Sequence, residues 1–253
     1  MQFWTPEPAI DDPNHYFYRP PPTAFVGTPA RTFLMGGVGF ATMLEALEKT
    51  ADRPLLWATT QFVSSAVPGA ELEIDIEPAM VGRSVIQARV TLREGNRIIQ
   101  QALAALGGRS DAVDHVFGTM PAVPQPEDCR LAEDRGAMPD SLVTQFEQRI
   151  AAQDEDAGAA HIWYREVDGA PMSVGLIAII ADFMGGAHPA TMGCTSLDNT
   201  LRIFTVKPAD WVLGVTEFSG FAKGVFHGTM HLYSEDGTLL AKASQTALIG
   251  RGG

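Results

Sequence analysis

The sequence predicts an α+β fold in which antiparallel strands surround two buried helices, and three observations lead to this class. One run, Val174–Ala181, is apolar on every side, as expected for a helix inside a core or a membrane. The run is about half of the ~20 residues that a bilayer requires, so we predict a core helix. Short runs of β-forming residues occupy most of the remaining chain, and the order of helix and strands occurs twice.

The composition is that of an ordinary globular protein. Its 253 residues carry a formal net charge of −12, which argues against a nucleic-acid surface. Cys129 and Cys194 are too few for a disulfide framework and fit a reducing compartment. The first residues lack the basic start and the apolar stretch of a signal peptide, so we expect a cytoplasmic protein.

The first half is predicted to contain an arm, a helix and four strands. The arm, residues 1–23, is rich in proline and leads into a strand near residues 16–19 or 24–27. Residues 33–49 start with glycines and continue with apolar side chains, which predicts a second buried helix. The four strands are expected at 54–63, 71–77, 85–93 and 97–106, the last two joined by the turn Glu94-Gly95-Asn96.

The second half follows a segment, 108–140, that has several prolines and no sustained periodicity. We interpret it as a linker on the surface, and we divide the chain into residues 1–110, 111–140 and 141–253. A helix within 171–188 is then expected among six strands. Their predicted ranges are 143–150, 161–167, 195–204, 211–219, 223–234 and 239–249.

The two halves repeat one pattern. Val174-Gly175 matches Val38-Gly39 at an offset of 136, and the offset grows to 141 at the last strands. A curled antiparallel sheet around a long buried helix is the hot-dog architecture, so the repeat predicts a double hot-dog.

The repeat also points to polar residues that the fold itself does not need. Asp182, Ser196 and Gln245 of the second copy stand where the first copy has Ala46, Thr60 and Ala104. An acid, a hydroxyl and an amide together suit the positioning of a water molecule whose proton the acid accepts. We therefore expect one functional site, in the C-terminal copy, and one degenerate site in the N-terminal copy.

Each of these residues also has a purely structural interpretation. Asp182 could anchor the following Gly185-Gly186 turn, Ser196 could be an ordinary strand hydroxyl, and Gln245 could be an edge polar residue. Asp198 shares the strand face of Ser196 in a regular strand and belongs either to the site or to the surface.

Other kinds of site are less well supported by the sequence. It has no nucleophile elbow, no phosphate-binding loop of the Walker type and no dinucleotide fingerprint. His227 and His231 lack further ligands, so we expect neither a metal nor a cofactor. Asp182 and His188 are similar to the Asp-then-His pair of hot-dog hydratases, although their spacing differs by one residue.

Three stretches carry a resemblance to a known family: IIADF with Asp182, the strand start Ser196-Leu197-Asp198, and Gln245 followed by an apolar run and Arg251. The chain resembles double hot-dog thioesterases of the acyl-CoA thioesterase II type over nearly its whole length. The resemblance implies hydrolysis of acyl-CoA by a water that Asp182, Ser196 and Gln245 activate. Members often have His where this chain has Asn199.

The glycines at the helix starts and the apolar helices predict how a substrate binds. Gly36 and Gly37 are expected to bring backbone N–H groups near the thioester carbonyl, where they could stabilise an oxyanion. An apolar channel between the helices, lined by Met43, Ile179 and Phe183, would hold the acyl chain. A homodimer or higher oligomer without a membrane span is expected. A non-catalytic acyl-CoA or lipid-binding module is the alternative function, and a purely structural hot-dog partner is a third.

Overall fold

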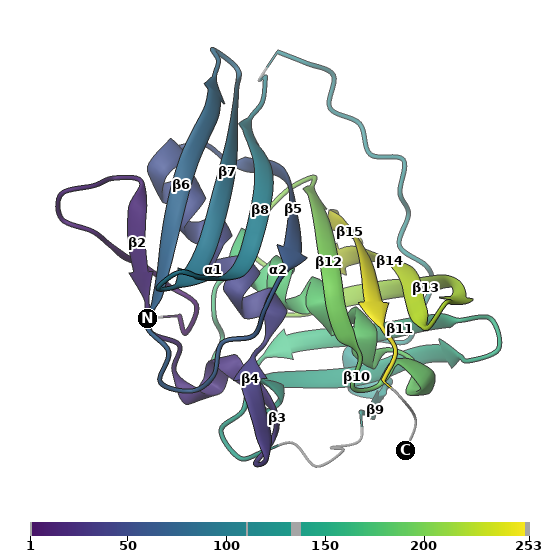
Figure 1. The fold of residues 1–253 in the computed structure, drawn as a ribbon. Helices are drawn as coiled ribbons and strands as arrows, with labels where there is room; N and C mark the ends of the chain where they lie inside the picture. The colour runs from purple at the N-terminus through teal and green to yellow at the C-terminus, as the bar shows by residue number, and fades with distance from the viewer. Residues whose placement is uncertain (1, 110, 133–137, 251–253) are drawn as a thin grey trace.

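In the computed structural model, which describes residues 2–109, 111–132 and 138–250, one large antiparallel sheet encloses two helices (Figure 1). Arg251 of the C-terminal motif lies outside the described residues. The strand order is β1-β2-β6-β7-β8-β5-β12-β15-β14-β13-β11-β10-β9, and β3 and β4 form a separate hairpin.

The elements have the following bounds. The strands are β1 Glu7–Pro8, β2 His15–Tyr18, β3 Phe25–Thr28, β4 Arg31–Leu34, β5 Leu55–Phe62, β6 Leu72–Val81, β7 Val85–Glu94, β8 Arg97–Gly107, β9 Arg130–Leu131, β10 Phe146–Asp154, β11 Ala159–Glu166, β12 Thr195–Ile203, β13 Val212–Ala222, β14 Val225–Ser234 and β15 Leu239–Leu248. The helices are α1 Gly36–Ala51 and α2 Val174–Ala181, with 3-10 turns at Pro22–Ala24, Pro126–Asp128, Leu142–Gln145, Asp182–Gly186 and Pro189–Thr191.

Helix α1 begins three residues later than predicted because residues 33 and 34 belong to strand β4. Its first residue is preceded by Met35, which has no side chain able to cap the helix. The helix ends where Asp52 adopts a left-handed conformation, with φ of 49°. Nearly every side chain between Val38 and Leu47 is buried, as the apolar pattern predicts.

Helix α2 is much shorter than the long helix expected within 171–188. The Ser173 hydroxyl caps it by accepting a hydrogen bond from Leu176 N–H at 3.1 Å, and all eight of its residues are buried. At Asp182 the chain tightens into a 3-10 turn that ends at Gly186. Two glycines followed closely by Pro189 favour this early end, because neither residue type stabilises a helix interior.

The sheet is arranged symmetrically about the contact between β5 and β12, where the two halves of the chain pair (Figure 1). Outward from that contact the order is β5-β8-β7-β6-β2 in one half and β12-β15-β14-β13-β11 in the other. Register irregularities also recur, between Leu55 and Trp57 on β5 and between Ser196 and Asp198 on β12. These two irregularities are 141 residues apart, so β5 and β12 correspond at that offset.

The described part of the linker packs along the outer face of the second half. Cys129 is buried beside Trp163 and Trp211 on the outer face of the second half, and the Trp163 indole N–H donates to the Pro124 carbonyl at 3.0 Å. Strand β9 then pairs with β10 at the edge of the sheet. The aromatic side chains on this outer face therefore form a second, smaller core with the linker.

Most of the remaining strand predictions are confirmed to within a few residues. Both alternatives near the N-terminus exist, as β2 and β3. The strand expected at 143–150 is shifted to Phe146–Asp154, because residues 142–145 form a 3-10 turn.

Candidate active site

Asp182 connects the two halves of the molecule. Its carboxylate, carried just beyond the last residue of α2, accepts a hydrogen bond from the Gly37 N–H at the start of α1 at 2.6 Å. Only glycine permits this approach, because a Cβ at position 37 would lie 2.7 Å from the Asp182 Cβ. Asp182 thus caps the first turn of the other helix, where the helix dipole favours negative charge, and does not cap the Gly185-Gly186 turn.

Gln245 and Ser196 lie beside this carboxylate. The Gln245 amide nitrogen donates to Asp182 Oδ1 at 2.6 Å and to the Ser196 hydroxyl oxygen at 3.0 Å. Both amide hydrogens are used in this way, so the Ser196 hydroxyl keeps its own hydrogen to donate elsewhere. The structure therefore brings together the three side chains that the sequence singled out.

Asn199 is a fourth polar residue of the cluster, and the sequence pattern did not select it for the site. In a regular strand Ser196 and Asn199 would face opposite sides, but the bulge at Leu197 puts both toward the interior. Asn199 is fully buried and lies opposite Gln245 on the neighbouring strand. Asp198 instead accepts a hydrogen bond from the Thr246 backbone N–H at 3.0 Å and holds the bulge in register.

Burial raises the pKa of the Asp182 carboxyl from 3.8 to about 7, although the Gly37 N–H and the amides of Asn199 and Gln245 lower it in part. A carboxylate with this pKa is half ionised near neutral pH and can take up a proton there. The neighbouring Cys194 thiol has its pKa raised to about 11 by burial and by the Asp182 charge. Cys194 therefore stays protonated and is a poor nucleophile at neutral pH.

Several buried polar atoms of the cluster have no hydrogen-bond partner among the described residues. They are the Gln245 side-chain oxygen and both polar atoms of the Asn199 amide. Although the Asn199 amide favours the charged form of Asp182, its geometry falls short of a hydrogen bond. Buried polar atoms of this kind are normally paired, and a water molecule with two to four polar neighbours satisfies them.

The sheet register corrects one of the correspondences between the halves. At the offset of 141 that the matching bulges give, Ser196 corresponds to Leu55 and not to Thr60. In the N-terminal half, the positions equivalent to Ser196, Asn199 and Gln245 are then occupied by the apolar residues Leu55, Ala58 and Ala104. The N-terminal half therefore has no polar counterpart of these three strand residues.

The residues predicted to bind substrate are placed less favourably. The Gly37 N–H is not free for a substrate oxygen because it already donates to Asp182, whereas the Gly36 N–H donates to no described residue. Met43 and Ile179 are fully buried in the core and expose no surface to a channel. Phe183 is only partly buried, and its ring stacks on Tyr164 with the centroids 5.5 Å apart.

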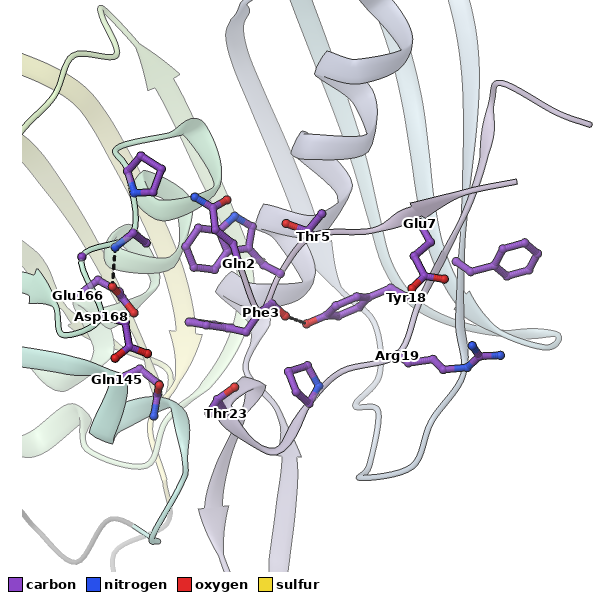
Figure 2. Close-up of a pocket in the computed structure, with 16 residues that line it drawn as sticks. Gln2, Phe3, Thr5, Glu7, Tyr18, Arg19, Thr23, Gln145, Glu166 and Asp168 are labelled. Carbon is purple, nitrogen blue, oxygen red and sulfur yellow. Dashed lines mark hydrogen bonds between the residues drawn. The ribbon is translucent and has the colours of Figure 1, made fainter. Parts of the chain in front are cut away.

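A cavity of about 720 Å³ lies at the other end of the helix pair, under the N-terminal arm (Figure 2). There Trp4 packs against Gly175 in the first turn of α2. The lining carries the acids Glu7, Glu166 and Asp168 but only one arginine, Arg19. This acidic lining disfavours a phosphorylated ligand, and none of the predicted site residues takes part in it.

Neither a metal site nor a membrane-spanning helix is found within the described parts of the chain. No three His, Cys, Asp or Glu side chains in those parts are grouped to hold a metal ion, and none of the described helices is long and apolar enough to span a membrane. His188 is engaged in its own loop, where it accepts the Ala190 N–H at 3.0 Å.

Three solved structures are similar to the chain over almost its full length. A candidate thioesterase from Novosphingobium aromaticivorans is 30% identical, with a TM-score of 0.90 over 95% of this chain and 97% of that one. A hot-dog-fold protein from Alicyclobacillus acidocaldarius is 20% identical, with a TM-score of 0.82 over 99% and 97% of the two chains. The acyl-CoA thioesterase II TesB2 of Mycobacterium marinum is 18% identical, with a TM-score of 0.78 over 99% and 97%.

Two family models match the sequence itself. Residues 28–107 match the acyl-CoA thioesterase N-terminal domain, and residues 126–249 match the acyl-CoA thioesterase C-terminal domain. Among proteins with curated functions, none matches the sequence significantly. The chain therefore belongs to the acyl-CoA thioesterase family and is a thioester hydrolase.

Proposed function

We propose that the protein hydrolyses acyl-CoA with a water molecule that Asp182, Ser196 and Gln245 hold and activate. The observation that carries this proposal is the Gln245 amide, which bonds Asp182 and Ser196 at once inside a buried cluster. A water there can donate one hydrogen to the Asp182 carboxylate and accept the hydrogen of the Ser196 hydroxyl. Its second hydrogen can be donated to the side-chain oxygen of Asn199 or Gln245.

The reaction follows from this arrangement. The water oxygen attacks the thioester carbonyl carbon while the Asp182 carboxylate takes one of its protons. The tetrahedral intermediate then collapses, the carbon–sulfur bond breaks, and the CoA sulfur leaves with a proton that the Asp182 carboxyl returns. The products are the free acid and CoA, and the carboxylate is restored. The Gly36 N–H is a candidate donor to the developing oxyanion.

The acyl chain is proposed to begin beside Phe183, which follows Asp182 directly and is only partly buried. Met43 and Ile179 form the core behind it and would have to move to admit a long chain between the helices.

Each half, residues 1–110 and 141–253, is proposed to be one hot-dog unit joined by the linker 111–140, which the symmetric strand order supports. A cytoplasmic homodimer or higher oligomer stays a prediction.

A thiol-release assay across short, medium, long and aryl acyl-CoAs tests the function. We expect free CoA to appear with at least one class of acyl chain, at a rate proportional to enzyme concentration. If acyl-CoAs only raise the melting temperature and release no thiol, the protein is a binding module and the hydrolytic role is wrong.

The pH dependence of kcat/KM provides a second test. Because the base must be ionised and the pKa of Asp182 is about 7, kcat/KM is expected to rise about tenfold per pH unit below pH 7 and to level off above it. The measurement runs from pH 5 to pH 8.5 with background hydrolysis subtracted. A rate that falls as the pH increases through 7 would mean that the essential group acts as an acid.

A further inference from the structure

Gln100 reaches the same site from the N-terminal half. It lies on β8, its side chain is 2% exposed, and its amide nitrogen donates to the Gly36 carbonyl at 2.9 Å. Because a carbonyl oxygen can only accept, the amide is oriented with its nitrogen toward Gly36. Gly39 leaves the space for this contact, since a Cβ there would lie 2.5 Å from the Gln100 nitrogen.

The contact continues directly to the carboxylate. The Gly36 carbonyl and the Gly37 N–H belong to one peptide group, and that N–H donates to Asp182 at 2.6 Å. A hydrogen bond to the carbonyl polarises the peptide and makes its N–H a stronger donor. Strand β8 of one half is thus linked through a single peptide to the acid of the other half.

The duplication shows that the fold itself does not require Gln100. Strands β8 and β15 correspond at an offset of 141, because the residue skipped at the register irregularity is Ile99 on β8 and Leu240 on β15. The residue that corresponds to Gln100 is then Ala241, which is fully buried. Gln100, like Asp182, is a buried polar residue found in one half only, and both meet at the same junction.

We propose that Gln100 is a positioning residue of the thioesterase reaction, which fixes and polarises the Gly36–Gly37 peptide so that its N–H holds the Asp182 carboxylate. The proposal rests on the proposed function of Asp182 as the base. Without the Gln100 donor, the peptide is a weaker and less constrained donor, so the ionised carboxylate loses stabilisation and the protonation midpoint of Asp182 rises.

Infrared titration tests this without substrate. The protonated carboxyl band of Asp182, identified by its loss in Asp182→Asn, is followed with pH in the wild type and in Gln100→Met, which keeps the side-chain length but removes the donor. We expect the midpoint to rise by about 0.5 to 1 pH unit in Gln100→Met. The matched control Gln101→Met changes the next residue on β8, which faces the other side of the sheet, and should leave the midpoint unchanged.

Kinetics supply the second readout. At pH 7 Gln100→Met is expected to lower kcat about 2- to 5-fold with little change in KM, because the ionised fraction of Asp182 falls by that factor. It should have no further effect in the Asp182→Asn background. If Gln100→Met fails to fold, Gln100→Ala replaces it, since the other half holds an alanine at this position. An unshifted midpoint in a folded variant overturns the positioning role alone. Full activity of Asp182→Asn overturns both this role and the proposed function.

Discussion

Asp182→Asn is expected to lower kcat for acyl-CoA hydrolysis by about 100- to 10,000-fold, the usual contribution of a general base. The amide keeps the size of the carboxyl but cannot accept a proton from water. The Gln245 side-chain oxygen has no partner among the described residues, so the Gln245 amide can rotate to meet the new side chain and the fold should persist. Thiol release, with circular dichroism on the same sample, measures both effects.

The matched control is Glu166→Gln. Glu166 is also a buried carboxylate and accepts a backbone hydrogen bond, from Ala170 at 2.8 Å, but it lies at the cavity beneath the N-terminal arm. Its change to Gln should leave kcat within about threefold of the wild type. Equal losses in the two variants would point to a general structural effect, and an active Asp182→Asn protein would remove Asp182 from the mechanism.

The second large effect concerns stability. The free energy of unfolding of Asp182→Asn, measured relative to that of the wild type, is expected to increase as the pH rises from about 4 to 7. Above pH 4 the carboxyl of the unfolded chain ionises, whereas the folded protein keeps its proton until the pH nears 7. The wild type therefore loses stability across this window, and the loss is complete above pH 7. The shift from 3.8 to about 7 corresponds to about 4 kcal/mol.

Chemical denaturation of both proteins at pH 4.5, 6 and 8 measures this difference. The comparison cancels the other titrating groups, because only position 182 differs. A constant difference in unfolding free energy across the three pH values would show that Asp182 is ionised in the folded protein throughout, with an ordinary pKa.

Much of the fold was predictable because local patterns and the repeat agree. The hairpin around Gly95 has its turn residue at a positive φ of 56°, and β7 and β8 lie within one residue of their predicted ends. The sequence predicts too long a helix because its apolar composition continues through Phe183 and Met184, past Ala181, where α2 ends. The contact between the linker and Trp163 could not be predicted, because it depends on tertiary packing that no local pattern reveals.

The site could be predicted only in part. Asp182 and Gln245 stand where the other half has Ala46 and Ala104, and that asymmetry is visible in the sequence. For Ser196 it is visible only in the sheet register, which places Leu55 at the matching position. Asn199 was missed because a bulge changes the face of the strand, and no glycine or proline marks the bulge. Ser196 pairs with Thr60 only if the offset of 136 between the helices is carried into the strands, whereas the matching bulges set the strand offset at 141.

Oxygen transfer in a single turnover tests the role of Asp182 most directly. Enzyme in excess is mixed with one acyl-CoA in water enriched in 18O, and the fatty acid and the peptide that contains Asp182 are weighed by mass spectrometry. If Asp182 acts as a base on bound water, the heavy oxygen enters the fatty acid and the peptide keeps its mass. A peptide that gains 2 Da would show that the carboxylate attacks the thioester itself, and the water held by Ser196 and Gln245 would not be the nucleophile.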